Sequence, residues 1–126
     1  MTLADTSVWI EHFRHGQVGL APLLSKAQIL MHPFVWGELA CGSLKNRAAV
    51  LSHLENLPAV TTATHSEVLM LIETHKLWSL GLGWIDCHLL ASSFLADCRF
   101  WTLDKRLAQA AARIGVSVST ASFTRH

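Results

Sequence analysis

The stretch Met1-Thr2-Leu3-Ala4-Asp5-Thr6-Ser7-Val8-Trp9-Ile10 opens the chain and predicts how the rest is organised. Its small and apolar residues run directly into an acid, as in a short buried strand that stops at Asp5. The hydroxyl residues Thr6 and Ser7 follow, and either can cap a helix. An acid at the carboxyl end of a strand lies where α/β sheets place their ligands and chemistry. The alternative is that Asp5 is only a helix cap.

Length and composition favour one compact domain, residues 1–126. Of the 126 residues, 51% are hydrophobic and 15% are charged, which is typical of a chain with a real core and excludes a disordered one. The net charge of +1 gives no global basic signal, so nucleic-acid binding would need a local patch. No apolar run reaches membrane-spanning length, and Asp5 and Glu11 interrupt the region where a signal peptide would be basic and then apolar. We therefore expect a cytoplasmic protein without a membrane segment.

Segments typical of strands and helices alternate along the chain. The expected strands are 1–4, 28–32, 59–62, 99–103 and 116–119, and the expected helices are 6–14, 20–26, 33–44, 46–57, 64–80, 84–98 and 105–114. Thr64 and Glu67 resemble a capping box, and the tail from residue 121 is expected to fray. Short connections between alternating elements predict an α/β fold, in which helices cover both faces of a mostly parallel sheet. This is a three-layer α/β/α arrangement with four to five short strands and about seven helices.

Four of the nine acidic residues stand at positions that favour chemistry. Asp5 and Asp104 each follow a predicted strand directly, and Glu38 and Asp86 each interrupt an otherwise apolar helix. Because neighbouring parallel strands end at the same edge of a sheet, Asp5 and Asp104 can approach each other. Asp86, in the first turn of the helix that leads to the strand before Asp104, can join them. The alternative for each acid is a helix cap or an internal hydrogen bond.

Clustered carboxylates need a counter-charge. Two like charges about 4 Å apart repel by roughly 4 kcal/mol at an effective dielectric near 20, and buried carboxylates resist ionisation. Oxygen ligands with open coordination positions suit Mg²⁺ or Mn²⁺, which bind together with substrate phosphates. Such a site can activate a water molecule and stabilise the leaving oxygen of a phosphodiester.

Other chemistries have weaker support in the sequence. His12 and His15 are three residues apart on one predicted helix, but no Cys or third His stands at zinc-ligand spacing. Cys41, Cys87 and Cys98 form no CxxC pair, so we expect reduced, buried thiols. All five tryptophans fall in apolar runs, which favours core packing or a dimer interface over stacking on bases.

The four acids lie in segments 4–7, 37–39, 83–91 and 101–107, which read Ala-Asp-Thr-Ser, Gly-Glu-Leu, Gly-Trp-Ile-Asp-Cys-His-Leu-Leu-Ala and Trp-Thr-Leu-Asp-Lys-Arg-Leu. In order and spacing these segments resemble the successive acidic motifs of PIN domains, and most of all those of the small VapC toxins of bacterial toxin–antitoxin pairs. The resemblance extends over essentially the whole chain. Each motif is weak alone, and four in order are specific.

The resemblance implies a metal-dependent endoribonuclease that cuts structured RNA at a loop of a transfer RNA or a ribosomal RNA. Asp5, Glu38, Asp86 and Asp104 correspond to the catalytic acids of the family. Of these, Asp5, Asp86 and Asp104 would be the ligands of Mg²⁺ or Mn²⁺, and Glu38 would orient or activate the attacking water.

Small hydroxyl residues beside the acids also match the family pattern. Thr6, Ser7 and Thr102 would donate hydrogen bonds to the catalytic carboxylates. Some PIN nucleases carry a further acid after the last motif, but Lys105 and Arg106 stand in that segment here. We therefore expect four catalytic acids and not five.

Basic residues near the motifs are candidates for phosphate contacts or for ordinary surface charges; they are Arg14, Lys45, Arg47, Lys105 and Arg106. Lys105 and Arg106 stand in the first turn of a predicted helix, where positive charge does not stabilise the helix. That position indicates a partner anion, either an RNA phosphate or the carboxylate cluster.

The family also implies partners. A VapC-type toxin is held inactive by a VapB-type antitoxin that lies along an apolar groove beside the acids, and members are usually homodimers. From their aliphatic content, we expect the helices between residues 33 and 57 to form that surface. The alternative function is a non-catalytic PIN scaffold that binds RNA or protein, although such scaffolds generally lose an acid and this chain keeps four. A phosphohydrolase of another α/β fold is less favoured, because the Asp-Thr-Ser opening lacks a second Asp.

Overall fold

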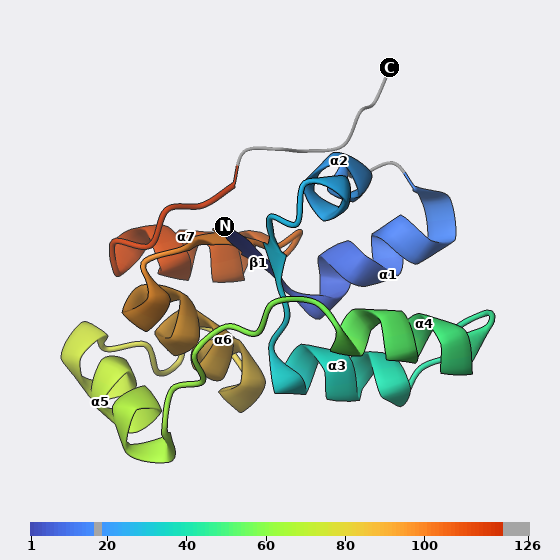
Figure 1. Cartoon of the computed structure of the whole chain (residues 1–126). Coiled ribbons are helices and arrows are strands. Elements are labelled where there is room, and N and C mark those ends of the chain that lie inside the picture. Colours follow the sequence, from blue (N-terminus) through green and yellow to red (C-terminus); the bar gives the residue numbers. More distant parts are fainter. Residues whose placement is uncertain (17–18, 120–126) are drawn as a thin grey trace.

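The computed structural model describes residues 1–16 and 19–119 (Figure 1). In this part of the chain, seven helices alternate with short strands. The strands are β1 (Thr2–Ala4), β2 (Ile29–Leu30) and β3 (Arg99–Trp101), and the helices are α1 (Thr6–His15), α2 (Leu20–Ser25), α3 (Pro33–Ala40), α4 (Arg47–Glu55), α5 (His65–His75), α6 (Trp84–Ala96) and α7 (Lys105–Arg113). The expected fraying of residues 121–126 lies outside the described residues.

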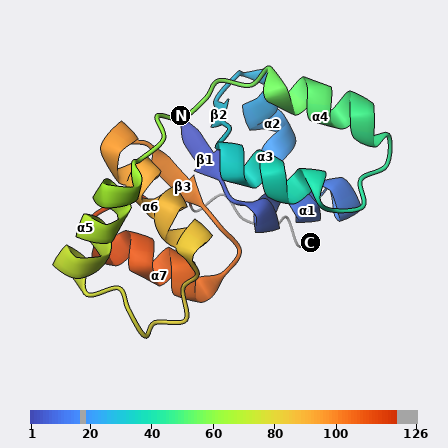
Figure 2. The ribbon, with the colours of Figure 1, turned by 90° about the horizontal axis from the view of Figure 1, so that it is seen from below.

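The three strands form one parallel sheet in the order β2-β1-β3, so β1 is central. The register places Leu3 opposite Leu30 on one side and Ala4 opposite Trp101 on the other. Figure 2 shows helices α1–α4 on one side of the strands and α5–α7 on the other. The predicted α/β fold with helices on both faces of a parallel sheet is therefore confirmed.

The predicted count of four to five strands was wrong, since the segments expected at 59–62 and 116–119 each contribute a single parallel bridge. Met31 pairs with Ala59, and Phe100 pairs with Val118. The reason lies in the neighbouring strands. His32 already caps α3 and Pro33 begins it, so β2 leaves little extended backbone for a partner.

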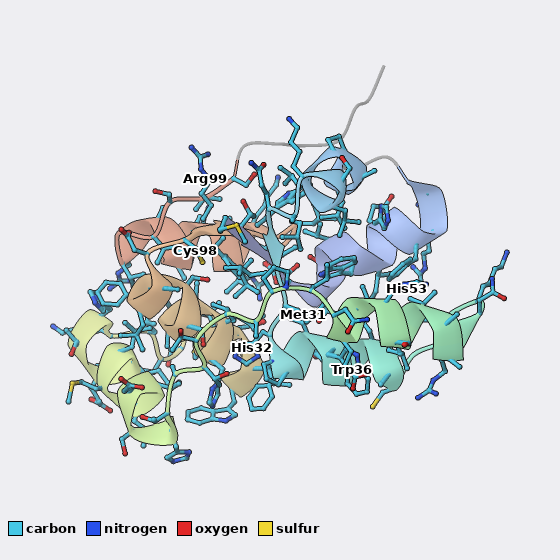
Figure 3. All side chains as sticks on the ribbon, in the orientation of Figure 1. Met31, His32, Trp36, His53, Cys98 and Arg99 are labelled. Carbon is cyan, nitrogen blue, oxygen red and sulfur yellow. The ribbon has the colours of Figure 1, made fainter. Side chains whose placement is uncertain are left out.

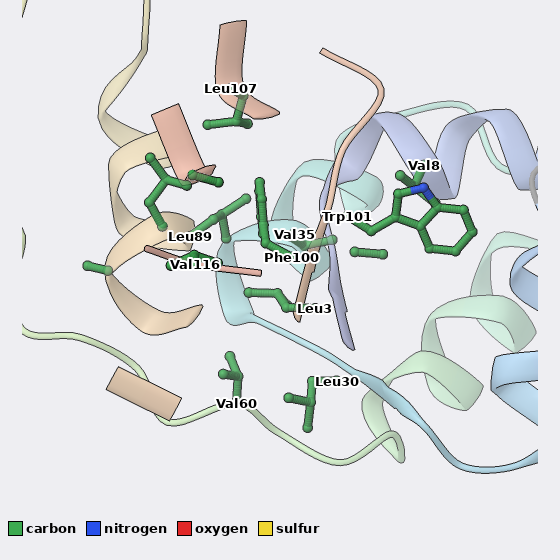
Figure 4. Packing of buried hydrophobic residues seen from close by; sticks show 14 of the residues in the cluster. Leu3, Val8, Leu30, Val35, Val60, Leu89, Phe100, Trp101, Leu107 and Val116 are labelled. Carbon is green, nitrogen blue, oxygen red and sulfur yellow. The ribbon is translucent and has the colours of Figure 1, made fainter. Parts of the chain in front are cut away.

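Side chains from both helical layers meet the sheet in one core (Figure 4). Leu3 and Phe100 are completely buried at its centre, and Trp9 and Trp101 are almost so. The expected packing of all five tryptophans in the core holds only in part, because Trp78 and Trp84 are 52% and 40% exposed. The three thiols are free, as expected, but only Cys87 is buried: Cys98 is half-buried, and Cys41 is exposed where α3 ends.

Helix ends follow local chemistry. Asp5, and not Thr6 or Ser7 as expected, caps α1, because its carboxylate accepts a hydrogen bond from the backbone N–H of Val8. The predicted capping box of Thr64 and Glu67 is present at the start of α5. None of the helices in the described ranges is long and apolar enough to cross a membrane.

Candidate active site

Three helices begin with an acid, either as the N-cap residue or in the first turn. Asp5 caps α1 directly after β1. Asp104 caps α7 shortly after β3, and its Oδ1 accepts hydrogen bonds from the N–H groups of Arg106 (2.9 Å) and Leu107 (3.4 Å). In the first turn of α6, Asp86 Oδ2 accepts one from Gly83 N–H at 2.9 Å. Helix N-termini carry positive partial charge that stabilises carboxylates. The same three carboxylates therefore stabilise the helix starts and form the acidic cluster.

Asp5 is the buried centre of this arrangement, with only 6% of the residue exposed. Its Oδ1 accepts a hydrogen bond from Ser7 Oγ at 2.5 Å, and its Oδ2 accepts one from the hydroxyl of Thr102. Thr102 lies beside Asp5 because the residues just before them, Trp101 and Ala4, are paired in the sheet. Both hydroxyls thus donate a hydrogen bond to one of the four acids.

The same hydroxyls connect Asp5 to the start of α7. The N–H of Asp104 donates to Thr102 Oγ1, and the N–H of Leu103 donates to Ser7 Oγ, both at 3.1 Å. One hydroxyl therefore stands between Asp5 and the backbone of Asp104, as expected for acids that follow neighbouring parallel strands.

Glu38 joins the site from α3. Its Oε1 accepts a hydrogen bond from Thr6 Oγ1 at 2.5 Å, and Thr6 directly follows Asp5. The sequence placed Glu38 in buried company, but the residue is exposed. The apolar neighbours of Glu38 point in other directions along the helix: Leu39, the next residue, is buried in the core. Glu38 thus lies at the mouth of the site and not inside it.

The electrostatics of the cluster are those of acids without a counter-charge. Burial raises the pKa of Asp5, and the negative charge of Asp86 raises it further, against the hydrogen bonds from Ser7, Thr102 and Val8, which lower it. In the described residues the one ion pair joins His15 to Glu11. None of the four acids therefore has a basic partner at ion-pair distance within residues 1–16 and 19–119.

This donor set fits a hard divalent cation. All the donors are carboxylate oxygens, and in the described ranges Asp86 Oδ1 and Asp104 Oδ2 accept no hydrogen bond that would compete with a metal. No group of three acidic, histidine or cysteine side chains within residues 1–16 and 19–119 is yet close enough to hold an ion. A cation would have to draw Asp86 and Asp104 closer to Asp5 than they stand here.

The candidate phosphate-binding residues are placed unequally. Arg106 lies over Gly81, in the loop that leads to α6; a Cβ at Gly81 would lie 2.7 Å from its Nη1. Lys105 is exposed beside it. Arg14 and Lys45 line a hollow of about 390 Å³ between the end of α1 and the segment after α3. Arg47 instead donates from Nη2 to the carbonyl of Ala40 at 2.8 Å, so its guanidinium already holds the end of α3.

Sequence reasoning did not single out one buried histidine, His32, which follows β2. His32 stands two residues after Leu30, which pairs with Leu3 of β1, and it caps α3. Figure 3 labels His32 where β2 leads into α3. The residue is completely buried, and its Nδ1 accepts a hydrogen bond from the N–H of Phe34. The available signal was its position: like Asp5, it directly follows an apolar strand.

The protonation of His32 follows from these contacts. Because Nδ1 is an acceptor, Nε2 carries the proton, and this buried N–H has no partner in the described residues. Burial first, and then nearby His88, lowers the pKa of His32 to about 4. His32 is therefore neutral at pH 7.

The chain is similar to known proteins over most of its length. The PIN domain family matches residues 2–113. Ribonuclease VapC32 of Mycobacterium tuberculosis, in the strains CDC 1551 / Oshkosh and H37Rv, is 46% identical over 120 residues, which is 94% of this chain and 97% of the relative.

Solved structures are similar at the level of the fold. The structure of FitAB bound to an IR36 DNA fragment has a TM-score of 0.68 at 14% identity, with 100% of this chain and 99% of that chain covered. The crystal structure of PAE2754 from Pyrobaculum aerophilum has a TM-score of 0.59 at 16% identity, with 93% and 81% covered. The family match spans most of the chain and the relative matches nearly all of it, so the chain belongs to the PIN domain family and, within it, to the VapC-type proteins.

Proposed function

We propose that this protein is an endoribonuclease that depends on Mg²⁺ or Mn²⁺ and acts as the toxin of a VapBC-type pair. It cleaves a structured RNA, at a loop of a transfer or ribosomal RNA, by water attack on a phosphodiester. The observation that carries the proposal is the buried Asp5 carboxylate, which lies where α1, α6 and α7 begin and has no basic partner in the part of the chain that the structure describes. The 46% identity to a protein named ribonuclease VapC32 supports the reaction class.

Asp5, Asp86 and Asp104 would hold the divalent cation. When bound, it would supply charge stabilisation of the phosphodiester and lower the pKa of a bound water. Ser7 and Thr102 keep the carboxylate of Asp5 in one orientation, because each hydroxyl donates to a different oxygen. The starts of α1, α6 and α7 add positive partial charge around the acids.

Glu38 would accept the proton of the attacking water. Thr6 donates to Oε1 and thereby fixes the carboxylate, which leaves Oε2 able to accept from a water molecule. Exposure suits this role, since a water enters from solvent. Arg106 and Lys105, at the start of α7, would contact RNA phosphates on either side of the cleaved bond.

Two apolar surfaces support the expected protein partners. A hollow of about 200 Å³ between α1 and the end of α3 is lined by Ile10 and Phe13 and reaches Glu38. We propose this groove for the VapB-type antitoxin, because a chain lying in it would reach the acids. A second apolar hollow, between α5 and α6, is our candidate for a homodimer contact. The activity would act on cytoplasmic RNA, and residues 1–126 would form a single PIN domain.

A non-catalytic PIN module that binds RNA or protein is the second candidate, favoured by the fact that no three acids in the described residues are gathered closely enough for a metal. One experiment separates the two functions. Purified parent, Asp5→Asn and Asp97→Asn are incubated with total RNA and Mn²⁺, with and without EDTA. Asp97→Asn is a matched control, because Asp97 ends α6 in a left-handed conformation that Asn also adopts.

Discrete cleavage by the parent and Asp97→Asn, lost in Asp5→Asn and in EDTA, is the result that the nuclease predicts. Binding of RNA without cleavage by the parent would favour the non-catalytic module. Arrest of bacterial growth by the expressed parent, relieved by Asp5→Asn, would identify the toxin.

A further inference from the structure

A shallow hollow of about 510 Å³ opens beside Glu38 between α3 and α6. Its lining is mostly apolar: Pro33, Phe34, Gly37, Glu38, Cys41 and Ile85. It borders the site directly, since Glu38 accepts a hydrogen bond from Thr6, the residue after Asp5. A strand of RNA whose phosphate lies at the acids would therefore place an adjoining nucleotide at this hollow.

Gly37 keeps the hollow open. Glycine is a poor helix former, and Gly37 lies inside α3. Its φ is not positive, and no atom of the described residues beyond its own surroundings in the helix lies within 4 Å of the place where a Cβ would stand. Neither the backbone nor the packing within the described residues requires glycine here. What the missing side chain provides is free space next to a catalytic acid.

Phe34 is a fixed ring at the edge of this space. His88 packs against it edge to face, with centroids 4.7 Å apart, and Trp84 packs against His88 in the same way at 4.7 Å. His32 lies on another side of Phe34, at 5.1 Å. The residue is only half-buried, so the ring is held from behind by its neighbours and still reaches the hollow.

We propose that the hollow binds one unpaired nucleobase of the RNA, next to the phosphodiester that the acids attack. This proposal rests on the proposed function. Aromatic side chains stack on nucleobases without strong preference for sequence. Among the lining residues the one charged group is Glu38, which can accept a hydrogen bond from a base N–H and would repel a phosphate. The chemistry of the hollow therefore suits a base and not the backbone.

The test fills the hollow without touching an acid. Gly37→Leu places a side chain in the open space, and Phe34→Leu removes the ring while keeping an apolar residue. Ala49→Leu makes a comparable addition on the exposed side of α4 and is the control. All are made in the Asp5→Asn background, so that binding is measured without cleavage. The probes are a short oligoadenylate, an oligouridylate and an abasic ribose-phosphate chain of the same length.

We expect Gly37→Leu and Phe34→Leu to bind the two base-containing chains about 5- to 140-fold more weakly, which corresponds to about 1–3 kcal/mol at about 1.4 kcal/mol per tenfold. Affinity for the abasic chain should change little, and Ala49→Leu should bind all three probes like its parent. Thermal unfolding checks the fold, and Gly37→Leu should melt no lower than its background because leucine is the better helix former.

An equal loss for base-containing and abasic chains, or no loss, overturns the proposal. So does a Gly37→Leu variant that keeps its base-dependent affinity and loses only the binding of an antitoxin peptide, since the occupant would then be a protein. If the parent, which keeps Asp5, cleaves RNA but the Gly37→Leu and Phe34→Leu variants bind the probes as their background does, the base-binding hollow is overturned and the proposed function stands. A parent that cleaves no RNA overturns the proposed function.

Discussion

Burial and the charge of Asp86 raise the pKa of Asp5, which gives this residue a measurable effect on stability. A carboxyl group whose pKa is raised in the folded state favours folding when it is protonated, and that contribution is lost as the pH rises through the raised value. We predict that in EDTA the metal-free parent loses stability relative to Asp5→Asn as the pH rises above the ordinary value of 3.8. Thermal unfolding of both proteins from pH 4 to 8 measures the difference.

The amide of Asn can still accept from one hydroxyl, so the comparison changes mainly the charge. Added Mn²⁺ should raise the melting temperature of the parent at pH 7 and leave that of Asp5→Asn unchanged. A melting difference that is constant across the pH range would contradict the raised pKa of Asp5.

His32 predicts the opposite dependence on pH. Its folded pKa of about 4 lies below the ordinary 6.5, so the unfolded chain takes up the proton first and stability falls as the pH drops from 6.5 to 4. The contribution at stake is about 3 kcal/mol at most. His32→Asn keeps a side chain that can cap α3 but does not titrate in this range. Chemical denaturation at pH 7 and pH 4.5 should show a larger loss for the parent than for His32→Asn; parallel losses would refute the assignment.

Among individual residues, the sequence identified the four acids but not His32. The motif comparison predicted Asp5, Glu38, Asp86 and Asp104, and the structure brings Ser7 and Thr102 against Asp5, and Thr6 against Glu38. Their catalytic and metal-binding roles stay predictions. His32 was missed because its complete burial depends on tertiary packing, which a single sequence does not contain.

Among the helices, α7 shows how one carboxylate can serve both fold and chemistry. Asp104 caps this helix through Oδ1 and is a proposed metal ligand. Asn caps helices about as well as Asp, whereas Ala at a cap costs about 1 kcal/mol. We predict that the free energy of unfolding of Asp104→Asn lies within about 0.5 kcal/mol of the parent value, although this variant loses RNA cleavage. Asp104→Ala should lose both the stability that the cap provides and RNA cleavage. Urea unfolding and a cleavage assay check this; an active Asp104→Asn would limit Asp104 to capping.

The elements themselves were largely predictable. All seven helices were expected, because each carries a cap signal or an apolar stripe, and the resemblance to PIN domains is confirmed. Helix ends were less predictable: the segment expected to run from 64 to 80 ends at His75, where Lys76 takes a left-handed conformation. The two outer segments expected as strands form only single bridges, because the pairing of a strand depends on how much of the adjacent strand is extended.

Over the whole molecule, the exposed apolar surface lies elsewhere than expected. We expected residues 33–57 to form the partner surface, but the large exposed apolar side chains of the described residues come from other elements. Leu69, Met70, Phe94 and Leu95 lie on α5 and α6, and Met70, Phe94 and Leu95 line a hollow of about 260 Å³. The sequence could not separate this face from the core, because an apolar helix position looks the same whether a partner covers it or the chain itself does.

We predict that this α5–α6 face joins two copies of the chain. Met70, which is 71% exposed, is the most accessible of these side chains. Met70→Lys should shift the protein from dimer to monomer in light scattering after gel filtration, with its melting behaviour otherwise close to normal, because a buried unpaired charge is costly at an interface. Ile10→Lys, in the groove between α1 and α3, is the control and should leave the dimer intact. A parent that is monomeric, or a dimeric Met70→Lys, would contradict this assignment.

Above all, we propose that acids from separate parts of the chain share one divalent cation. Calorimetric titration with Mn²⁺ tests it most directly, on the metal-free parent, Asp5→Asn, Asp86→Asn and the control Asp97→Asn. We expect the parent and Asp97→Asn to bind Mn²⁺, and Asp5→Asn and Asp86→Asn to lose this binding. A parent that binds no Mn²⁺, or Asp5→Asn and Asp86→Asn that bind it as the parent does, would contradict it.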